Sequence, residues 1–191
     1  MDLSDVARPV TGLLDGAMDR TLVLGYTRIG SGLRRRWWPA DPAPDALVGK
    51  RVLVSGATAG IGLEMARAFA GLGATVHLLG RNAEKVERCV AEIAEQIPGA
   101  ALVGEVCDVS DLDAVVAWTT DFANRVPALD GLVHNAGLMP KERNVTPQGH
   151  ELQLATHILG PHLMTERLLP LLRAARGASV VFVSSGGMYS T

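Results

Sequence analysis

The stretch from residue 51 to residue 62 decides the fold, and it reads RVLVSGATAGIG. It begins with a continuous apolar run, which is typical of a strand that is buried on both faces of a parallel sheet. From Ile61 onward apolar residues return every three or four positions, at Met65, Phe69 and Leu72, which predicts an amphipathic helix. A buried strand that passes through a glycine-rich turn into a helix predicts the first unit of an α/β protein.

The rest of the chain repeats this alternation of apolar runs and helix-spaced stretches. Further strands are predicted at residues 74–79, 101–106, 129–133 and 180–183, with helices around residues 86–97, 112–126 and 147–173. Parallel strands joined by right-handed helical crossovers place helices on both faces of the sheet. We therefore predict an α/β fold with a Rossmann-like, doubly wound parallel sheet in the order 3-2-1-4-5, truncated after the fifth strand. Ligands bind at the carboxyl ends of the strands in such sheets.

Length and composition bound the class of protein. With 191 residues, 48% of them hydrophobic and 20% charged, the chain is expected to form a compact domain and not a disordered segment. A formal charge of −2 creates no field that attracts nucleic acid, so no nucleic-acid partner is expected. The chain has only two cysteines and no apolar run of about 20 residues, and residues 1–10 do not resemble a secretory signal. We therefore expect a cytoplasmic protein in a reducing compartment.

Residues 1–48 differ from the rest and are assigned to an N-terminal helical arm and linker, which leaves residues 49–191 for the Rossmann domain. The arm carries a basic run at residues 34–36 directly before Trp37 and Trp38. Basic and indole side chains are suited to a membrane surface, so weak membrane contact is one interpretation. The other interpretation is a helix that packs on the domain with its arginines in solvent.

The glycine-rich turn after the first strand has the chemistry of a phosphate site. A helix N-terminus presents unpaired N–H groups and the positive end of the helix dipole, so an anion binds there if the backbone approaches closely. Gly56 permits a tight turn, and Gly60 and Gly62 permit the approach of a diphosphate. The alternative is a flexible surface loop in a glycine-rich chain. The residues assigned to dinucleotide binding are Ser55, Gly56, Thr58, Gly60, Ile61 and Gly62.

Four motifs, in order along the chain, resemble those of the short-chain dehydrogenase/reductase family. They are the Gly-x-x-x-Gly-x-Gly loop at residues 55–62, Asp108-Val109, His134-Asn135-Ala136-Gly137 and the strand that ends in Ser184-Ser185. His134 replaces the first asparagine of the family motif. The resemblance covers residue 48 to the end, so residues 49–191 correspond to an incomplete NAD(P)-binding domain of the family. Residues 184–188 look nearest to the branch that includes dehydrogenase/reductase family member twelve.

The resemblance also implies roles for individual residues. The carboxylate of Asp108 is expected to hold the adenine amino group, and Ser185 is expected to act as the catalytic serine that hydrogen-bonds the substrate oxygen. Further cofactor contacts are implied for Val109, Asn135, Ala136 and Gly137.

The end of the second strand indicates the cofactor. Dehydrogenases of this kind that use NAD place an acidic side chain there, which binds the ribose 2′-hydroxyl and repels a 2′-phosphate. This chain has Gly80, which leaves space, and Arg81, whose planar cation suits a phosphate. We therefore predict NADP(H) as the cofactor in preference to NAD(H). The alternative is that Arg81 is a solvated surface arginine.

The resemblance implies hydride transfer between the nicotinamide and a small-molecule carbonyl or alcohol substrate. In the family a tyrosine donates or accepts the proton, and a lysine four residues later lowers the tyrosine pKa. No Tyr-x-x-x-Lys occurs in residues 1–191, where Tyr189 is followed by Ser190 and Thr191. We expect a truncated reductase or a fragment of one, inactive by itself. The alternative is a dinucleotide-binding protein without redox chemistry, a pseudo-enzyme. Family members commonly pair through their helices, so a homo-oligomer is a further expectation, unless the arm covers that surface.

His157 occupies the position of a fourth family residue, an asparagine whose backbone carbonyl holds a water molecule. Pro161 lacks an N–H group, so the carbonyl of residue 157 loses its helical partner and the helix is expected to kink there. The alternative is a simple helix irregularity. No metal site is predicted, because His150, His157 and His162 do not have the spacing that places ligands on one helical face. The serine segment also lacks the Gly-x-Ser-x-Gly pattern of α/β hydrolases.

Overall fold

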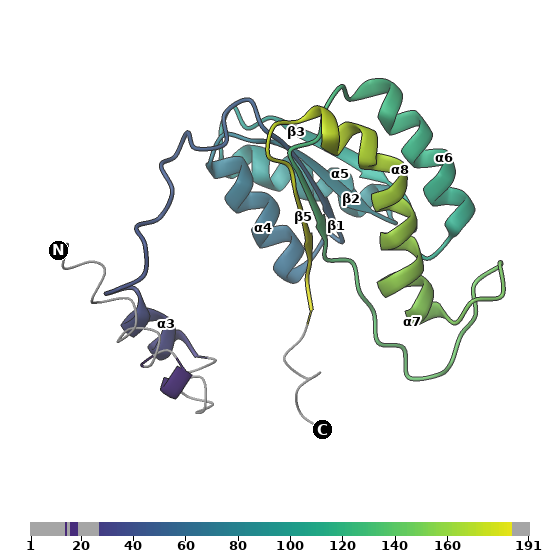
Figure 1. Cartoon of the computed structure of the whole chain (residues 1–191), viewed down its shortest axis with the longest axis horizontal. Coiled ribbons are helices and arrows are strands. Elements are labelled where there is room, and N and C mark those ends of the chain that lie inside the picture. Colours follow the sequence, from purple (N-terminus) through teal and green to yellow (C-terminus); the bar gives the residue numbers. More distant parts are fainter. Residues whose placement is uncertain (1–13, 15, 19–26, 185–191) are drawn as a thin grey trace. The chain divides into compact units, whose positions relative to one another are not determined.

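The computed structural model describes residue 14, residues 16–18 and residues 27–184. Five parallel strands form one sheet in the order β3-β2-β1-β4-β5 (Figure 1). The strands are β1 (Arg51–Ser55), β2 (Thr75–Gly80), β3 (Leu102–Val106), β4 (Gly131–His134) and β5 (Ser179–Phe182). The predicted Rossmann-like sheet and its strand order are confirmed.

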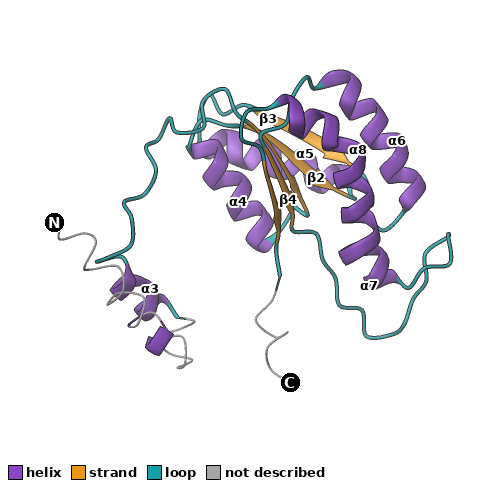
Figure 2. Ribbon diagram, viewed as in Figure 1, coloured by secondary structure: helices purple, strands orange, loops and turns teal. Residues whose placement is uncertain are grey.

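Helices cover both faces of this sheet (Figure 2). In the domain they are α4 (Gly60–Gly71), α5 (Ala83–Gln96), α6 (Leu112–Arg125), the short α7 (Leu152–Leu154), the π-helical turn η1 (Ala155–Leu159) and α8 (Gly160–Ala174). Helix α5 ends directly before the segment Ile97-Pro98-Gly99, where the proline and the positive φ of Gly99 stop it as predicted.

Successive side chains of a strand pack alternately in two hydrophobic cores, one on each face of the sheet. In β1, Val52 and Val54 pack in the core under α4 and α5, whereas Leu53 packs in the core under α6 and α8. Successive side chains of a strand point to opposite faces, so a strand between two helical layers must be apolar at every position. The continuous apolar runs of the sequence therefore have their explanation in these two cores.

A buried polar cluster lies between the sheet and α6. The Glu105 carboxylate on β3 accepts hydrogen bonds from His77 Nδ1 at 3.0 Å, from Trp118 Nε1 at 3.0 Å, and from both terminal nitrogens of Arg125 at 3.1 and 2.9 Å. The Glu105 side chain is only 4% exposed. Burial raises the pKa of this carboxyl, but the hydrogen bonds from the three partners outweigh burial and lower the pKa to about 2. Glu105 is therefore a buried, fully partnered anion.

The long helical segment before β5 begins later than the sequence analysis predicted. We expected a helix from residue 147, whereas the first helical residue is Leu152. The prediction was wrong because Gly149 adopts a φ of +82°, which stops a helix. Glu151 then caps the helix, since its carboxylate accepts from the backbone N–H groups of the first turn.

A π-helical turn precedes Pro161, which agrees with the alternative interpretation, a helix irregularity. The kink expected at residue 157 stays a prediction. Gly160 donates its N–H group to the carbonyl of Ala155, five residues earlier. Such single π-turns occur frequently at functional sites. The water molecule expected at the carbonyl of residue 157 stays a prediction.

The chain divides into two compact units, Met1–Pro42 and Ala43–Thr191. In the first unit, α3 (Arg28–Arg34) is followed by Trp38, whose exposed fraction is 48%. In the second unit, Leu47 donates its N–H group to the carbonyl of Leu72 and packs on the core under α4 and α5. Within the described residues no helix is long and apolar enough to cross a membrane. Membrane contact and packing on the domain both stay predictions for the N-terminal arm. The expectation that its arginines lie in solvent is wrong for Arg34, which is buried, whereas Arg35 and Arg36 are exposed.

Candidate dinucleotide site

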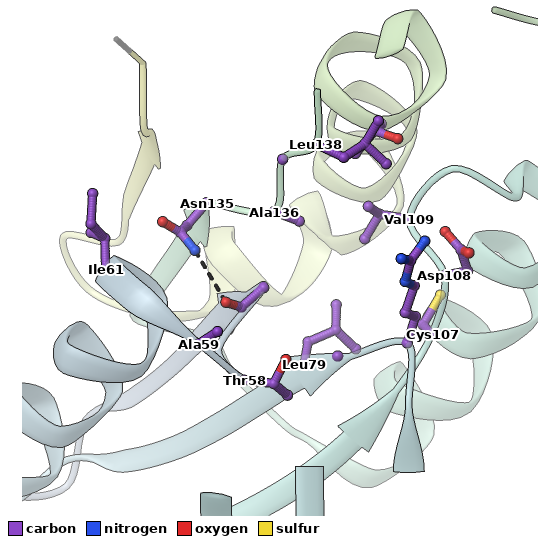
Figure 3. A pocket seen from close by; sticks show the side chains of 15 residues that line it. Thr58, Ala59, Ile61, Leu79, Cys107, Asp108, Val109, Asn135, Ala136 and Leu138 are labelled. Atoms are coloured by element: carbon purple, nitrogen blue, oxygen red, sulfur yellow. Dashed lines mark hydrogen bonds between the residues drawn. The ribbon is translucent and has the colours of Figure 1, made fainter. Parts of the chain in front are cut away.

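A cavity of about 390 Å³ opens at the carboxyl ends of the strands (Figure 3). This volume lies within the usual range of small-molecule sites. The cavity lies where the sheet order reverses between β1 and β4, the place where doubly wound sheets bind ligands. Its lining residues are Gly56, Thr58, Ala59, Ile61, Leu79, Gly80, Arg81, Cys107, Asp108, Val109, Asn135, Ala136, Gly137, Leu138 and Thr156.

The turn between β1 and α4 leaves the first turn of α4 open to an anion. Gly60 has a φ of +54°, and a Cβ atom built on it would meet nothing within 4 Å. The residue before the helix, Ala59, makes no side-chain capping hydrogen bond, and the first turn carries no acidic side chain. The N–H groups at the start of α4 therefore have no cap from the side chain of Ala59, and the space beside the Cα of Gly60 is open.

Two glycines of this turn are needed for contacts within the protein. Gly56 has a φ of +67°, and its Cβ would lie 2.7 Å from the Cα of Ala136. A Cβ on Gly62 would overlap the carbonyl oxygen of Gly56 and the amide nitrogen of Asn135. Gly62 therefore permits α4 to pack on the turns after β1 and β4. Its assignment to the approach of the diphosphate stays a prediction.

Ser55 does not line the cavity but holds two of its lining residues in place by hydrogen bonds. Its Oγ accepts hydrogen bonds from the backbone N–H groups of Asn135 at 3.0 Å and Ala136 at 3.1 Å. In return, the Asn135 side chain donates to the carbonyl of Ser55 at 3.1 Å and to the carbonyl of Gly56 at 3.3 Å. The dashed line in Figure 3 marks the second of these bonds. Ser55 is buried and Asn135 and Ala136 line the cavity, so these bonds fix two walls relative to each other. Our assignment of Ser55 to direct cofactor binding is not supported by this geometry.

One end of the cavity is apolar with a single carboxylate. Leu79, Cys107 and Val109 line it together with Asp108. Asp108 Oδ1 accepts from the N–H and the hydroxyl of Ser110 at 2.9 and 2.7 Å, which holds the carboxylate in place. Burial raises the pKa of the Cys107 thiol to about 12, so this cysteine contributes apolar surface and not a nucleophile. The arrangement has the chemistry of a site for an adenine ring, whose amino group needs an acceptor.

Arg81 lines the cavity at the end of β2, as the sequence predicts. The reason given for its neighbour Gly80 was wrong, because the space beside this glycine is already filled. A Cβ on Gly80 would lie 2.6 Å from Cγ2 of Thr58 and 2.9 Å from Cγ2 of Val86. Gly80 is therefore required for the close packing of Thr58, which itself lines the cavity.

A further part of the cavity lining is formed by Gly137, Leu138 and Thr156. His157 lies at the rim, exposed to solvent, and its Nε2 accepts a hydrogen bond from the backbone N–H of Leu138 at 3.1 Å. Leu138 and Thr156 were missed in the sequence analysis. Both could have been found from the sequence, because Leu138 directly follows Gly137 and Thr156 directly precedes His157, and the family motifs identify these two neighbours.

His134 is buried next to the site and is not part of the lining. Burial lowers its pKa to about 4, so the imidazole is neutral at physiological pH. Its Nε2 lies 2.8 Å from Oγ1 of Thr165, and its ring stacks on Phe182 of β5. His134 therefore joins β4, β5 and α8. Ser185, three residues after the end of β5, lies outside the described residues, and its catalytic role stays a prediction.

Comparison with known proteins assigns the chain to a protein family. The family model for short chain dehydrogenases matches residues 50–189. The chain belongs to the short chain dehydrogenase family. This establishes the family of oxidoreductases that the four motifs predict.

The individual relatives agree with this assignment. An uncharacterized oxidoreductase of Schizosaccharomyces pombe is 34% identical over 162 residues, which is 85% of this chain and 47% of that protein. Dehydrogenase/reductase SDR family member 12 of Bos taurus is 31% identical over 163 residues, or 85% of this chain and 51% of that protein. The chain thus spans about half the length of these curated relatives.

Solved structures show the same architecture. A short chain dehydrogenase of Escherichia coli, complexed with NADPH, has a TM-score of 0.66 and 32% identity, with 75% of this chain and 62% of that chain covered. One of Shigella flexneri, complexed with NADP, has a TM-score of 0.65 and 31% identity, with the same coverage.

Proposed function

We propose that residues 49–191 form the NADP(H)-binding part of a short chain dehydrogenase. The complete enzyme would transfer a hydride between this cofactor and a small-molecule carbonyl or alcohol. When bound, the nicotinamide supplies the hydride chemistry. The residues of this chain bind and orient the dinucleotide.

The fit of the cavity to a dinucleotide supports the proposal. The start of α4 offers N–H groups without a side-chain cap beside open space at Gly60, which suits a diphosphate. The apolar end with Asp108 suits the adenine, and Gly137, Leu138 and Thr156 would contact the nicotinamide half. The related structures from Escherichia coli and Shigella flexneri are complexed with NADPH and NADP.

Arg81 is the observation that carries the choice of NADP(H). It lines the cavity at the end of β2, where a carboxylate would select NAD(H) by repelling a 2′-phosphate. A guanidinium group forms paired, charge-assisted hydrogen bonds with a phosphate and loses them with a bare ribose hydroxyl.

Calorimetric titration with NADPH and NADH tests this proposal. Wild-type protein should bind NADPH about tenfold or more tightly than NADH, because hydrogen bonds to charged groups contribute about 1.5–3 kcal/mol. Arg81→Gln should remove most of this preference. Arg88→Gln, at an exposed position of α5 outside the cavity, should preserve it. Equal affinities in the wild type, or an unchanged preference in Arg81→Gln, would contradict the proposal.

Catalysis should be absent from the polypeptide of residues 1–191. Ser185 offers the substrate oxygen a hydrogen bond, but no tyrosine in these residues is followed by a lysine four positions later. Hydride addition leaves negative charge on the oxygen, which needs a proton donor. We expect NADPH to bind and no NADPH oxidation with a panel of aldehydes and ketones. Turnover by this polypeptide would refute its inactivity, and binding without turnover by a longer form that contains Tyr-x-x-x-Lys would favour a non-catalytic protein.

A further inference from the structure

The imidazole of His157 connects two walls of the cavity. Its Nε2 accepts the N–H of Leu138 at 3.1 Å. The ring also lies against Gly137, because a Cβ built on that glycine would be 3.1 Å from Nε2 and 3.6 Å from Cδ2 of His157. Gly137 and Leu138 both line the cavity. One side chain therefore contacts the whole of this short wall.

The element that carries His157 is held firmly in the domain. Ala155 and Thr156 of η1 are buried, and so is Gly160 at the start of α8. Gly160 lies so close to the loop after β3 that a Cβ there would overlap the carbonyl oxygen of Val109. The opposite is true of the segment that follows Leu138, where Met139 has an exposed fraction of 90%. The His157 contact thus ties the beginning of an exposed loop to a fixed helical turn.

The bond depends on the protonation state of the ring. A backbone N–H can only donate, so Nε2 accepts from Leu138 only when it carries no proton. Imidazolium has N–H groups on both nitrogens and cannot accept this bond. The asparagine that the family has at this position would offer a carbonyl oxygen, which accepts at any ordinary pH.

The charged surroundings of His157 are simple. The segment 135–138 that packs against the ring contains no titratable side chain. On the helical side, the carboxylate of Glu151 interacts electrostatically with His157, and Arg143 in turn interacts with Glu151. Glu151 accepts hydrogen bonds from the backbone of Gln153 and Leu154, which fixes it at the start of α7.

We propose that His157 is a positioning residue that holds the Gly137–Leu138 wall of the dinucleotide cavity through its unprotonated Nε2, so that the order of this wall and the affinity for the cofactor fall when the imidazole is protonated. The claim about affinity for the cofactor rests on the proposed function. The claim about the order of the Gly137–Leu138 wall concerns the protein without cofactor and does not depend on that function.

The first experiment measures the wall directly in the cofactor-free protein. Hydrogen exchange of the Leu138 amide, corrected for the intrinsic rate, is followed by NMR from pH 8 to pH 5.5. The wild type should lose protection at the lower pH, whereas His157→Asn should keep the same protection throughout. His157→Phe, which has no acceptor, should be unprotected at both pH values. Protection of Leu138 that does not change with pH in the wild type, or that survives in His157→Phe, would overturn the inference.

The second experiment measures the affinity for NADP⁺, which tolerates mild acid better than NADPH. The 2′-phosphate titrates in the same range, so the comparison with His157→Asn isolates the contribution of the imidazole. Between pH 8 and pH 5.5 the wild type should weaken about two- to fivefold more than His157→Asn, the amount expected from one exposed neutral hydrogen bond. His162→Asn, at an exposed position of α8, is the matched control and should follow the wild type.

The two experiments separate the inference from the function. Superimposable pH profiles of the wild type and His157→Asn would overturn the positioning role. The role would also be overturned if the pH profile of His162→Asn differed from that of the wild type as much as the profile of His157→Asn does. If no variant binds NADP⁺ or NADPH at any pH, the proposed function fails, while the Leu138 protection still decides whether His157 holds the wall.

Discussion

Replacing Glu105 by glutamine tests how much the buried cluster on β3 contributes to stability. The glutamine keeps the shape of the side chain, but it replaces one acceptor oxygen by an NH₂ group that faces N–H donors. The donors are His77, Trp118 and Arg125. His77 and Trp118 are buried, and buried donors that lose their acceptor carry the full cost of desolvation, so the change should be strongly destabilising. Arg125 is 42% exposed and can bond to water instead.

The expected size follows from the pKa of the carboxyl. A lowering from the ordinary value of 4.5 to about 2 corresponds to about 3 kcal/mol of preferential stabilisation of the ionised form in the folded state. We therefore expect Glu105→Gln to lower the free energy of unfolding at pH 7 by about 3 kcal/mol. In a domain of this size that equals a decrease of about 6–12 °C in Tm.

The same pKa predicts the dependence of stability on pH. A carboxyl whose folded-state pKa is depressed contributes stability above its unfolded-state pKa, and this contribution is lost as the pH falls through the folded-state pKa. For Glu105 the window lies between about 4.5 and 2. From pH 5 to pH 2.5 the wild type should lose about 2 kcal/mol more than Glu105→Gln, which no longer carries this carboxyl.

Urea denaturation followed by circular dichroism at 222 nm measures both quantities. Glu95→Gln, at an exposed position of α5, is the control and should stay within about 0.5 kcal/mol of the wild type. The m-value should not change, because the same surface is exposed on unfolding. A loss below 1 kcal/mol in Glu105→Gln, or parallel pH profiles of the two proteins, would refute the reasoning.

Three further substitutions test the packing around the site. Gly62→Ala should destabilise the domain by about 2 kcal/mol or more and weaken NADPH binding, because a Cβ atom at this position has no room. Gly71→Ala on the same helix is the control and should be neutral or stabilising. Equal melting temperatures of the two variants would contradict this prediction. Gly160→Ala should destabilise similarly through its overlap with Val109, measured by urea denaturation, and a stability equal to wild type would show that the helix shifts freely. Ser55→Ala should cost about 1 kcal/mol, because two partly buried N–H groups lose their acceptor; a calorimetric melt within 0.5 kcal/mol of wild type would exclude that role.

The sequence predicted the site at the level of segments. The strand, glycine-rich turn and helix at residues 51–72 could be recognised because the periods of strand and helix are local properties of the chain. Arg81, Asp108 and Asn135 could be located because each follows a predicted strand, and the carboxyl ends of parallel strands meet at one edge of the sheet. Hence the cavity lies where these residues were expected.

The individual roles were less predictable. Gly62 and Gly80 were interpreted as space for the cofactor, yet each makes room for another part of the protein. Glu105 gave no signal at all, because a single charged residue in a strand is indistinguishable from one that faces solvent. Its partners become apparent only when α6 packs on β2 and β3.

The amino-acid sequence alone therefore determined the order of strands and helices, the edge of the sheet that binds a ligand and the family, since each of these depends on patterns within a few neighbouring residues. Only the tertiary structure decided which residues line the cavity and which support it. Ser55 and Asn135 stand 80 positions apart, and their hydrogen bonds exist only because β1 and β4 lie side by side in the folded sheet.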